Sequence, residues 1–273
     1  MGLRVNTNIA ALSAQRNLAS VSGRLSGNFS RLSSGLRIAT AADDAAGLGI
    51  SERMRGQIRS LAVASRNAQD GVSLAQTTEG ALQEVNNNLN RMRELAIQAA
   101  NGTLTTADRA TLDTEFQALI TEIDRVSTQT TFNGVALLDG TVTSLDLQVG
   151  TSAGETITVT LSDMTGTALS IMGEDVTSAA NASAVLGVID AAIDQVTTAR
   201  GALGAAQNRL TSSIASILNT RENLSAAESR IRDVDVALET ADLTRNSILQ
   251  QAAVSVLAQA NTQPQLALTL LQG

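Results

Sequence analysis

The sequence contains no cysteine, histidine, tryptophan or tyrosine, and all nineteen of its cationic side chains are arginines. Without cysteine there is no disulfide and no thiolate zinc site, and without histidine the commonest general base and metal ligand is missing. Without lysine there is no Schiff base and no phosphate-loop lysine. Only carboxylate, hydroxyl or metal-on-oxygen chemistry is left, and no Asp/Glu cluster has ligand spacing. We therefore predict no enzymatic activity, no metal and no cofactor.

Aromatic residues make up 1% of the 273 residues, and the net charge is −7 with a pI of about 4.7. A nucleic-acid partner is not expected, because duplex binding needs an excess of cations and base stacking needs aromatic rings. A membrane partner is not expected either, because no apolar stretch approaches the roughly 20 residues that span a bilayer. No signal peptide is visible, so general sorting rules alone indicate the cytosol.

Proline occurs once, at Pro264, which permits very long helices and is expected to interrupt the last one. Apolar residues recur at helical spacing near the start of the chain and again, with a mean step close to 3.5, over a longer stretch. The first stripe is Leu18, Val21, Leu25, Phe29, Leu32 and Leu36. The second runs from Ile50 to Met92 with Glu79 as its one polar gap. Between them, residues 39–49 are expected to form a connector, in which Asp43 and Asp44 cap the following helix.

The middle of the sequence changes period. Thr105-x-x-Asp108 is a capping-box pattern that opens a third helix, which is expected to stop before Thr130. Asn133-Gly134 is a turn dipeptide, and the alternating apolar residues of 145–149 and 157–161 predict a β-hairpin.

A strict heptad follows from Leu186 to Ile231, with one seam apolar throughout and a companion seam that is only partly apolar. This pattern predicts a long helix packed against other helices at unequal depths. Polar members of the companion seam include Arg200 and Gln207. The order is thus helix, long helix, helix, small β insertion, long helix, helix, with amphipathic stripes at both ends that cannot bury themselves alone.

Several long motifs resemble bacterial flagellin, the family of flagellar filament subunits. They are Asn6-Thr-Asn-Ile-Ala, Leu32-Ser-Ser-Gly-Leu-Arg-Ile, Ala41-Ala-Asp-Asp-Ala-Ala-Gly-Leu-Gly-Ile-Ser, Asn67-Ala-Gln-Asp-Gly-Val-Ser, Arg91-Met-Arg-Glu-Leu-Ala-Ile-Gln-Ala-Ala-Asn-Gly-Thr, Glu122-Ile-Asp-Arg-Val, Phe132-Asn-Gly, Ala226-Ala-Glu-Ser-Arg-Ile-Arg-Asp-Val-Asp and Ala260-Asn-Thr-Gln-Pro-Gln-Leu-Ala-Leu-Thr-Leu-Leu. The match covers roughly residues 1–140 and 185–273.

The resemblance implies a mainly α fold, a long antiparallel coiled-coil bundle with a small β-hairpin insertion. Residues 1–43 with 233–273 would pair as an inner terminal-helix domain that lines the filament channel. Residues 44–232 would form an outer helical domain, with its hairpin region at about 132–180. No large outer variable domain is expected.

The resemblance further implies a structural subunit that self-assembles into the flagellar filament used for motility. It implies export in an unfolded state by a type III apparatus, which replaces the cytosolic assignment with a secreted, extracellular filament. Implied partners are copies of itself, an export chaperone, and filament cap and hook-junction proteins. Arg91, Leu95, Gln98 and Glu115 match the flagellin surface recognised by the Toll-like innate immune receptor, which gives a hypothetical contact site.

The apolar stripes lead to a mechanism in which the chain ends become ordered only when neighbouring subunits cover them. The residues expected to carry self-assembly are Leu18, Leu25, Phe29, Leu32, Leu249, Val256, Leu266 and Leu270. The alternative is the flagellin-like hook–filament junction protein, which shares both chain ends with flagellin. A carboxylate-based or metal-dependent enzyme is the third and least favoured hypothesis.

Overall fold

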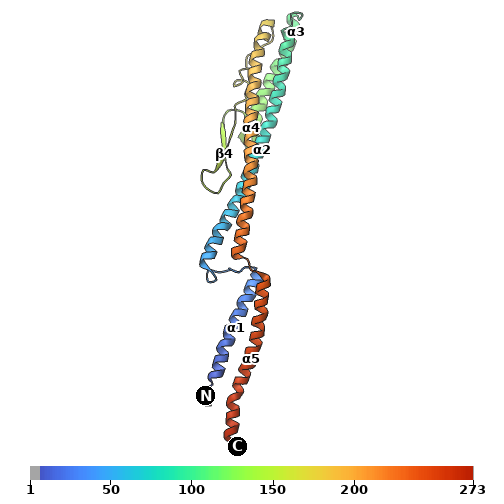
Figure 1. Cartoon of the computed structure of the whole chain (residues 1–273). Helices are drawn as coiled ribbons and strands as arrows, with labels where there is room; N and C mark the ends of the chain where they lie inside the picture. Colours follow the sequence, from blue (N-terminus) through green and yellow to red (C-terminus); the bar gives the residue numbers. More distant parts are fainter. Residues whose placement is uncertain (1–6, 273) are drawn as a thin grey trace. The chain divides into compact units, whose positions relative to one another are not determined.

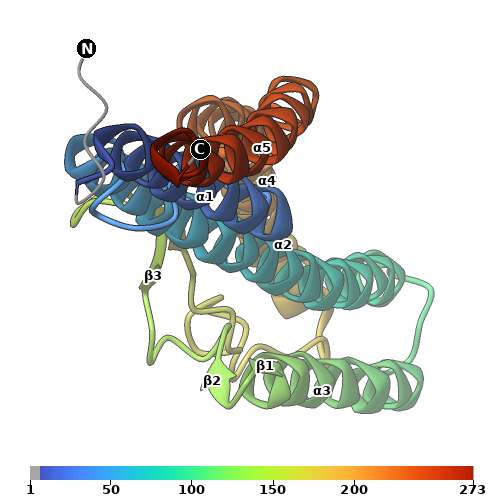
Figure 2. The same cartoon turned by 90° about the horizontal axis from the view of Figure 1, so that it is seen from below.

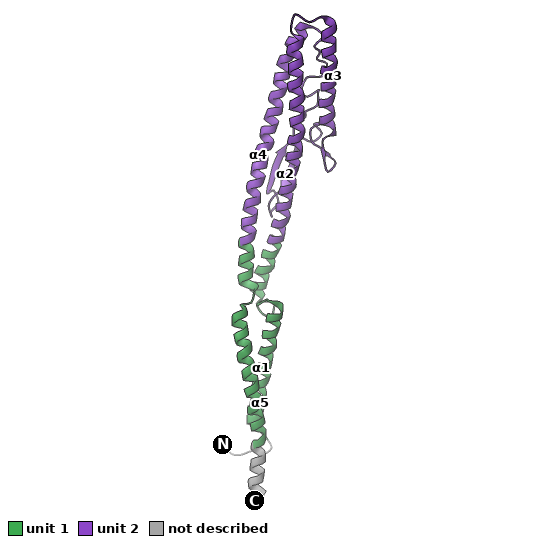
Figure 3. Ribbon diagram, turned by 90° about the vertical axis from the view of Figure 1, so that its right-hand side faces the viewer, with its two compact units in different colours: residues 1–56, 223–273 green, residues 57–222 purple. Residues whose placement is uncertain are grey.

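The computed structural model describes residues 7–272, with side chains described as far as residue 262. Its packing divides the chain into two units, Met1–Gly56 with Asn223–Gly273 and Gln57–Glu222 (Figure 3). The elements are α1 (Ile9–Ser34), α2 (Ala45–Ala99), α3 (Thr106–Gln129), β1 (Thr131–Phe132), β2 (Val135–Ala136), β3 (Ser144–Gln148), β4 (Thr156–Thr160), α4 (Ala179–Arg232) and α5 (Val236–Gln272) (Figure 1). The mainly helical fold with its small hairpin is confirmed. The predicted domains, 1–43 with 233–273 and 44–232, stay a proposal.

In the first unit, α1 and α5 lie antiparallel and side by side (Figure 1). Asn8 caps α1 by accepting a hydrogen bond from the amide of Ala11, and Gly35 ends the helix in the left-handed conformation, with a φ of 70°. A side chain with Cβ is strained at that φ, which is why glycine suits this C-cap position. The ends of α1 are therefore set by the local sequence.

The connector after α1 is shorter than predicted. The structure begins α2 at Ala45, whereas the sequence pattern placed the connector as far as residue 49. Asp44 accepts a hydrogen bond from the amide of Gly47, so the expected capping role is confirmed for this carboxylate. The glycines after Asp44 suggested a loop, but they are included in the first turns of the long capped helix.

In the second unit, α2 and α4 supply most of a continuous apolar core. The apolar heptad seam of α4 is buried from Ile189 to Ile217, whereas Ile193, Gln207 and Ile214 of the companion seam are only half-buried. The predicted packing at unequal depths is confirmed. Arg200 and Gln207 both contact Glu79, so the polar gap of α2 faces polar positions of α4.

The capping box of α3 forms as predicted, with Thr105 and Asp108 each accepting a hydrogen bond from the backbone of the other. Asn133 and Gly134 form the turn between β1 and β2, and β3 pairs antiparallel with β4 so that Leu145 lies opposite Val159. Figure 2 shows α2 and α3 with the strands and loops of this unit. These elements follow short-range signals, which explains why the sequence predicts them well.

An irregular segment, residues 161–177, packs along α3 and was not predicted. Four α3 side chains bind its backbone in antiparallel order. Asp113 accepts from the amide of Val176 and Asp124 from that of Gly166, while Gln117 and Ser127 donate to backbone carbonyls at 174 and 164. Side chains of a helix thus take the place of a neighbouring strand in satisfying this backbone.

The last helix, α5, continues through Pro264 to Gln272, so the predicted interruption is wrong. A proline removes one backbone donor from a helix, and a long helix can continue past that loss. Among the helices that the structure describes, none is long and apolar enough to cross a membrane.

Candidate functional site

The seam between α1 and α5 is built from small and polar side chains. Ala14 and Val21 of α1 and Ala260 of α5 are buried, and the Asn8 side chain donates to the carbonyl of Ala260 over 2.7 Å. These buried side chains are small and the larger apolar side chains of α1 are only half-buried, so the fully buried core of this helix pair is thin among the described residues.

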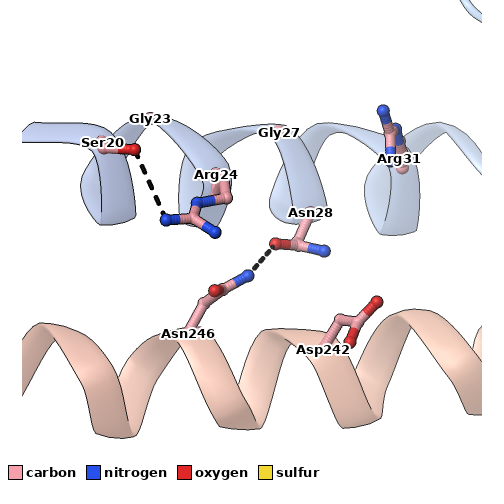
Figure 4. Close-up of a pocket in the computed structure, with 8 residues that line it drawn as sticks. All are labelled: Ser20, Gly23, Arg24, Gly27, Asn28, Arg31, Asp242 and Asn246. Atoms are coloured by element: carbon pink, nitrogen blue, oxygen red, sulfur yellow. Dashed lines mark hydrogen bonds between the residues drawn. The ribbon is translucent and has the colours of Figure 1, made fainter. Parts of the chain in front are cut away.

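Three polar side chains complete the seam. Asn28, which is 7% exposed, donates to Glu239 over 2.5 Å. It also accepts from Asn246 over 2.9 Å, as Figure 4 shows. Glu239 is also within 4.0 Å of the Arg31 guanidinium. An open groove of about 540 Å³ lies beside Asn28 and Asn246, along Gly23 and Gly27. The seam therefore contains one buried carboxylate with an amide donor and a nearby cation.

The sequence pattern misplaced one residue of this seam. It put Phe29 in the inward stripe, but Phe29 is 57% exposed and Asn28 takes the buried position. The steps 18, 21, 25, 28, 32 alternate strictly as 3, 4, 3, 4, which is the coiled-coil spacing. This regular spacing could have identified Asn28 as the inward residue. The apolar Phe29 next to it was chosen instead because apolar residues are usually the buried ones.

The other predicted self-assembly residues fall into three groups. Leu249 and Val256 are exposed on α5, whereas Leu18, Leu25 and Leu32 are half-buried on α1. The side chains of Leu266 and Leu270 lie outside the described residues. Further large apolar side chains are exposed on the same two helices, namely Ile9, Leu12, Val236, Leu238, Ile248 and Val254. The helix pair thus leaves much of its apolar surface uncovered in the single chain.

Where α1 leads into α2 and α4 into α5, the two connections bind each other. Leu36 and Asp233 form an isolated antiparallel bridge, and the amide of Val234 donates to the carbonyl of Gly35. Arg232 donates to Glu52 over 2.7 Å, and this hydrogen bond is the main reason why the pKa of Glu52 lies below its usual value. The two connections are therefore joined by backbone hydrogen bonds, and an ion pair beside them joins α4 to α2.

The residues expected to contact an immune receptor do not all lie on the surface. Arg91 is exposed and donates to Glu115 and Glu94 over 2.9 Å each, and these carboxylates raise its pKa, Glu94 most. Gln98 is also exposed, but Leu95 is 1% exposed and packs in the core of the second unit. Leu95 is therefore a core residue, because its helix face turns inward at that position.

Within the described part of the chain, no group of three or more carboxylates could hold a metal ion.

Two family models match this chain. The model described as the bacterial flagellin N-terminal helical region matches residues 5–143, and that of the C-terminal helical region matches residues 186–271. Together they cover well over half of the sequence. The chain belongs to the bacterial flagellin family.

Full-length relatives agree with this flagellin assignment. A flagellin of Halalkalibacterium halodurans is 49% identical over 270 residues, which cover 98% of this chain and 99% of the relative. A flagellin of Bacillus subtilis is 47% identical, with 99% of this chain and all of the relative covered. The crystal structure of Bacillus cereus flagellin is 34% identical with a TM-score of 0.52, over 60% of this chain and 94% of that one.

This flagellin is a structural subunit of the bacterial flagellar filament, as its family and its full-length relatives show. The prediction from the sequence is confirmed, and the alternative of a hook–filament junction protein is not favoured. The flagellin family is one of structural proteins.

Proposed function

We propose that the α1–α5 pair is the element through which this flagellin assembles, by folding that is completed when neighbouring subunits cover its outer faces. The observation that carries the proposal is the concentration of exposed large apolar side chains on these two helices. Burying a side chain such as valine or leucine contributes about 1.5–3 kcal/mol. Several such residues on each subunit provide a driving force for association.

A helical filament follows from contacts between unlike surfaces. When one face of a subunit binds a different face of the next, and the rotation between subunits does not close, the assembly grows without limit. Phe29 and Ile9 of α1 and Leu238 and Val256 of α5 offer apolar surface on both partners of the helix pair. We propose that residues 1–43 with 233–273 form the inner, channel-lining domain and residues 44–232 the outer one.

The finer partners are also proposals. A flagellin that assembles outside the cell has to be exported, and we propose secretion through a type III apparatus with an export chaperone that holds the C-terminal helix. Filament cap and hook-junction proteins are the proposed partners during growth. We propose no enzymatic activity, since the flagellin family is one of structural proteins.

A pair of aspartate variants tests the assembly role. Val256→Asp places a charge on the outer face of α5, where we expect it to raise the critical concentration for seeded filament growth more than about tenfold. Met172→Asp is the matched control, because Met172 is 54% exposed and Val256 59% exposed, but Met172 lies in the second unit. Electron microscopy and sedimentation after seeding measure both, and equal growth of the two variants would contradict the proposal.

We also propose that Arg91, Gln98 and Glu115 form part of a surface that a Toll-like innate immune receptor can recognise. What supports it is that these three side chains are exposed and that Arg91 and Glu115, on α2 and α3, are joined by an ion pair of 2.8 Å. The pair holds an arginine and a carboxylate in a fixed arrangement on one surface.

Arg91→Ala removes the guanidinium from that surface, so we expect receptor signalling by the soluble monomer to fall at least about tenfold. Arg93→Ala is the control, since Arg93 is on the same helix and pairs instead with Asp190 of α4. A reporter-cell assay over a range of monomer concentrations measures the effect. Unchanged signalling by Arg91→Ala would refute the proposed contact.

A further inference from the structure

The α1–α5 seam has little apolar material with which to fix its alignment. Among the residues whose side chains the structure describes, the buried apolar side chains of the two helices are Ala14, Val21 and Ala260. The half-buried Leu18, Leu25 and Leu32 of α1 are themselves spaced by seven residues, so a slip of seven would place leucine where leucine was and cost this seam little apolar contact. Something other than apolar packing has to select one register.

The polar trio of Asn28, Glu239 and Asn246 can make that selection. Glu239 and Asn246 are one heptad apart on α5, and Asn28 lies between them on α1, bonded to both. A slip by one heptad in one direction would place Asn28 between Asn246 and Ala253 and leave the buried Glu239 carboxylate without its amide donor. A slip in the other direction would take Asn28 away from the buried Asn246 amide. Either loss is costly because desolvated polar groups need partners.

We propose that Asn28, Glu239 and Asn246 are the specificity-determining residues that set the register of α1 against α5. A single buried polar residue is known to fix the register of coiled coils at some cost in stability. The inference deepens the proposed function and rests on it, because the register decides which outer faces the pair presents to neighbouring subunits.

The first test exchanges the hydrogen-bonding roles. Asn28→Asp sets two carboxylates against each other, and we expect the critical concentration for filament growth to rise more than tenfold. Adding Glu239→Gln restores one carboxylate and one amide, with Asn246 still donating to residue 28, and should bring growth back to within about threefold of the unchanged chain. Asn17→Asp, at an exposed position of the same helix, is the control. Failure of Glu239→Gln to rescue Asn28→Asp would count against the trio.

The second test reads the register directly, using the absence of cysteine from the chain. Asn8 contacts Ala260 and Asn28 lies between Glu239 and Asn246, so counting along antiparallel helices places Gln250 opposite Val21. Val21→Cys is combined in turn with Leu243→Cys, Gln250→Cys or Leu257→Cys, which are one heptad apart. Disulfide formation under mild oxidation then reports the alignment on a non-reducing gel.

With the trio intact, we expect cross-linking at least tenfold faster at position 250 than at 243 or 257. With Asn28, Glu239 and Asn246 all changed to leucine, the preference should fall below about twofold. Retention of the preference for position 250 in the leucine variant would overturn the inference. The cross-link can be measured in soluble protein and in filaments, so this failure is distinguishable from a failure of the proposed assembly role, which Val256→Asp tests.

Discussion

Arg232 is a cation that is only 9% exposed, and it forms an ion pair with Glu52 on another helix. The hydrogen bond from Arg232 is the largest cause of the lowered pKa of Glu52, followed in the same direction by Arg55. Because the folded pKa of Glu52 lies below its unfolded value of about 4.5, the ionised carboxylate stabilises the folded chain above that pH. This contribution is lost as the pH falls through the folded pKa.

Glu52→Gln should therefore remove one contribution to the loss of folding stability at low pH. We expect the Tm of the variant to be lower than that of the unchanged chain at neutral pH, and the difference to shrink as the pH is lowered below about 4.5. Thermal unfolding followed by circular dichroism across this range measures the effect. Glu84→Gln is the control, because Glu84 is exposed and has no ion pair among the described residues. A difference in Tm that is constant with pH would rule out this role for Glu52.

Single residues also show where sequence patterns stop being informative. The spacing of apolar residues placed Phe29 inward, but Phe29 is 57% exposed, and the resemblance to flagellin placed Leu95 on a contact surface, but Leu95 is 1% exposed. Periodicity gives the direction of a side chain only to within the width of a helix face, about one residue. At the edge of an apolar stripe the side chain's direction is decided by the element that packs against it, and the sequence does not show which residues of that element lie opposite.

Glu79 on α2 contacts Arg200 and Gln207 on α4. The polar positions in these two apolar seams can be explained only once it is known that the two helices pack together. The sequence predicted a polar gap in one helix and two polar seam positions in the other, without linking them. In the structure the Gln207 amide donates to Glu79 over 3.1 Å, and the Arg200 guanidinium lies 3.8 Å from it. Polar positions of neighbouring seams match because an unmatched one would be partly buried without a partner.

Glu79→Ala should destabilise the second unit by about 1 kcal/mol, less than the roughly 1.5–3 kcal/mol of a hydrogen bond to a charged group, because Glu79 is partly exposed. Urea unfolding of the variant, and of Gln207→Ala with and without it, measures the coupling. We expect the double variant to lose less free energy of unfolding than the sum of the losses of the two single variants. Strict additivity would show that the two side chains do not act as a pair.

The helices and turns that the sequence predicted correctly are those whose signals come from residues close together in the chain. The capping box at Thr105, the turn at Asn133-Gly134 and the heptads of α4 each depend on residues close in sequence. Residues 161–177 were not predicted, because their order comes from α3 side chains such as Asp113 and Asp124. Those side chains are some 40 to 60 residues away, and no local pattern marks them as partners.

Across the whole chain, buried apolar surface is unevenly divided. The large, fully buried side chains, among them Phe116, Leu82 and Ile189, lie in the second unit, whereas α1 and α5 keep apolar side chains exposed. The stripes at the chain ends predicted this contrast. The stability of the second unit should therefore be nearly independent of assembly, while that of the helix pair should depend on it.

Deleting residues 260–273 tests this division in the whole protein. The deletion removes the carbonyl of Ala260 that Asn8 contacts and shortens the surface of α5, so we expect seeded filament growth to be abolished. The remaining chain should stay soluble and helical, because the core cluster of the second unit lies within residues 57–222. Electron microscopy measures growth, and circular dichroism with thermal unfolding measures the remaining fold.

Filament growth and thermal unfolding together distinguish two results that would contradict this expectation. Normal filaments from the shortened chain would show that the end of α5 is not needed for assembly. Loss of filaments together with loss of cooperative unfolding would show instead that the core of residues 57–222 depends on the helix pair. Only lost growth with a preserved unfolding transition fits a chain whose middle folds by itself and whose paired ends are completed by neighbouring subunits.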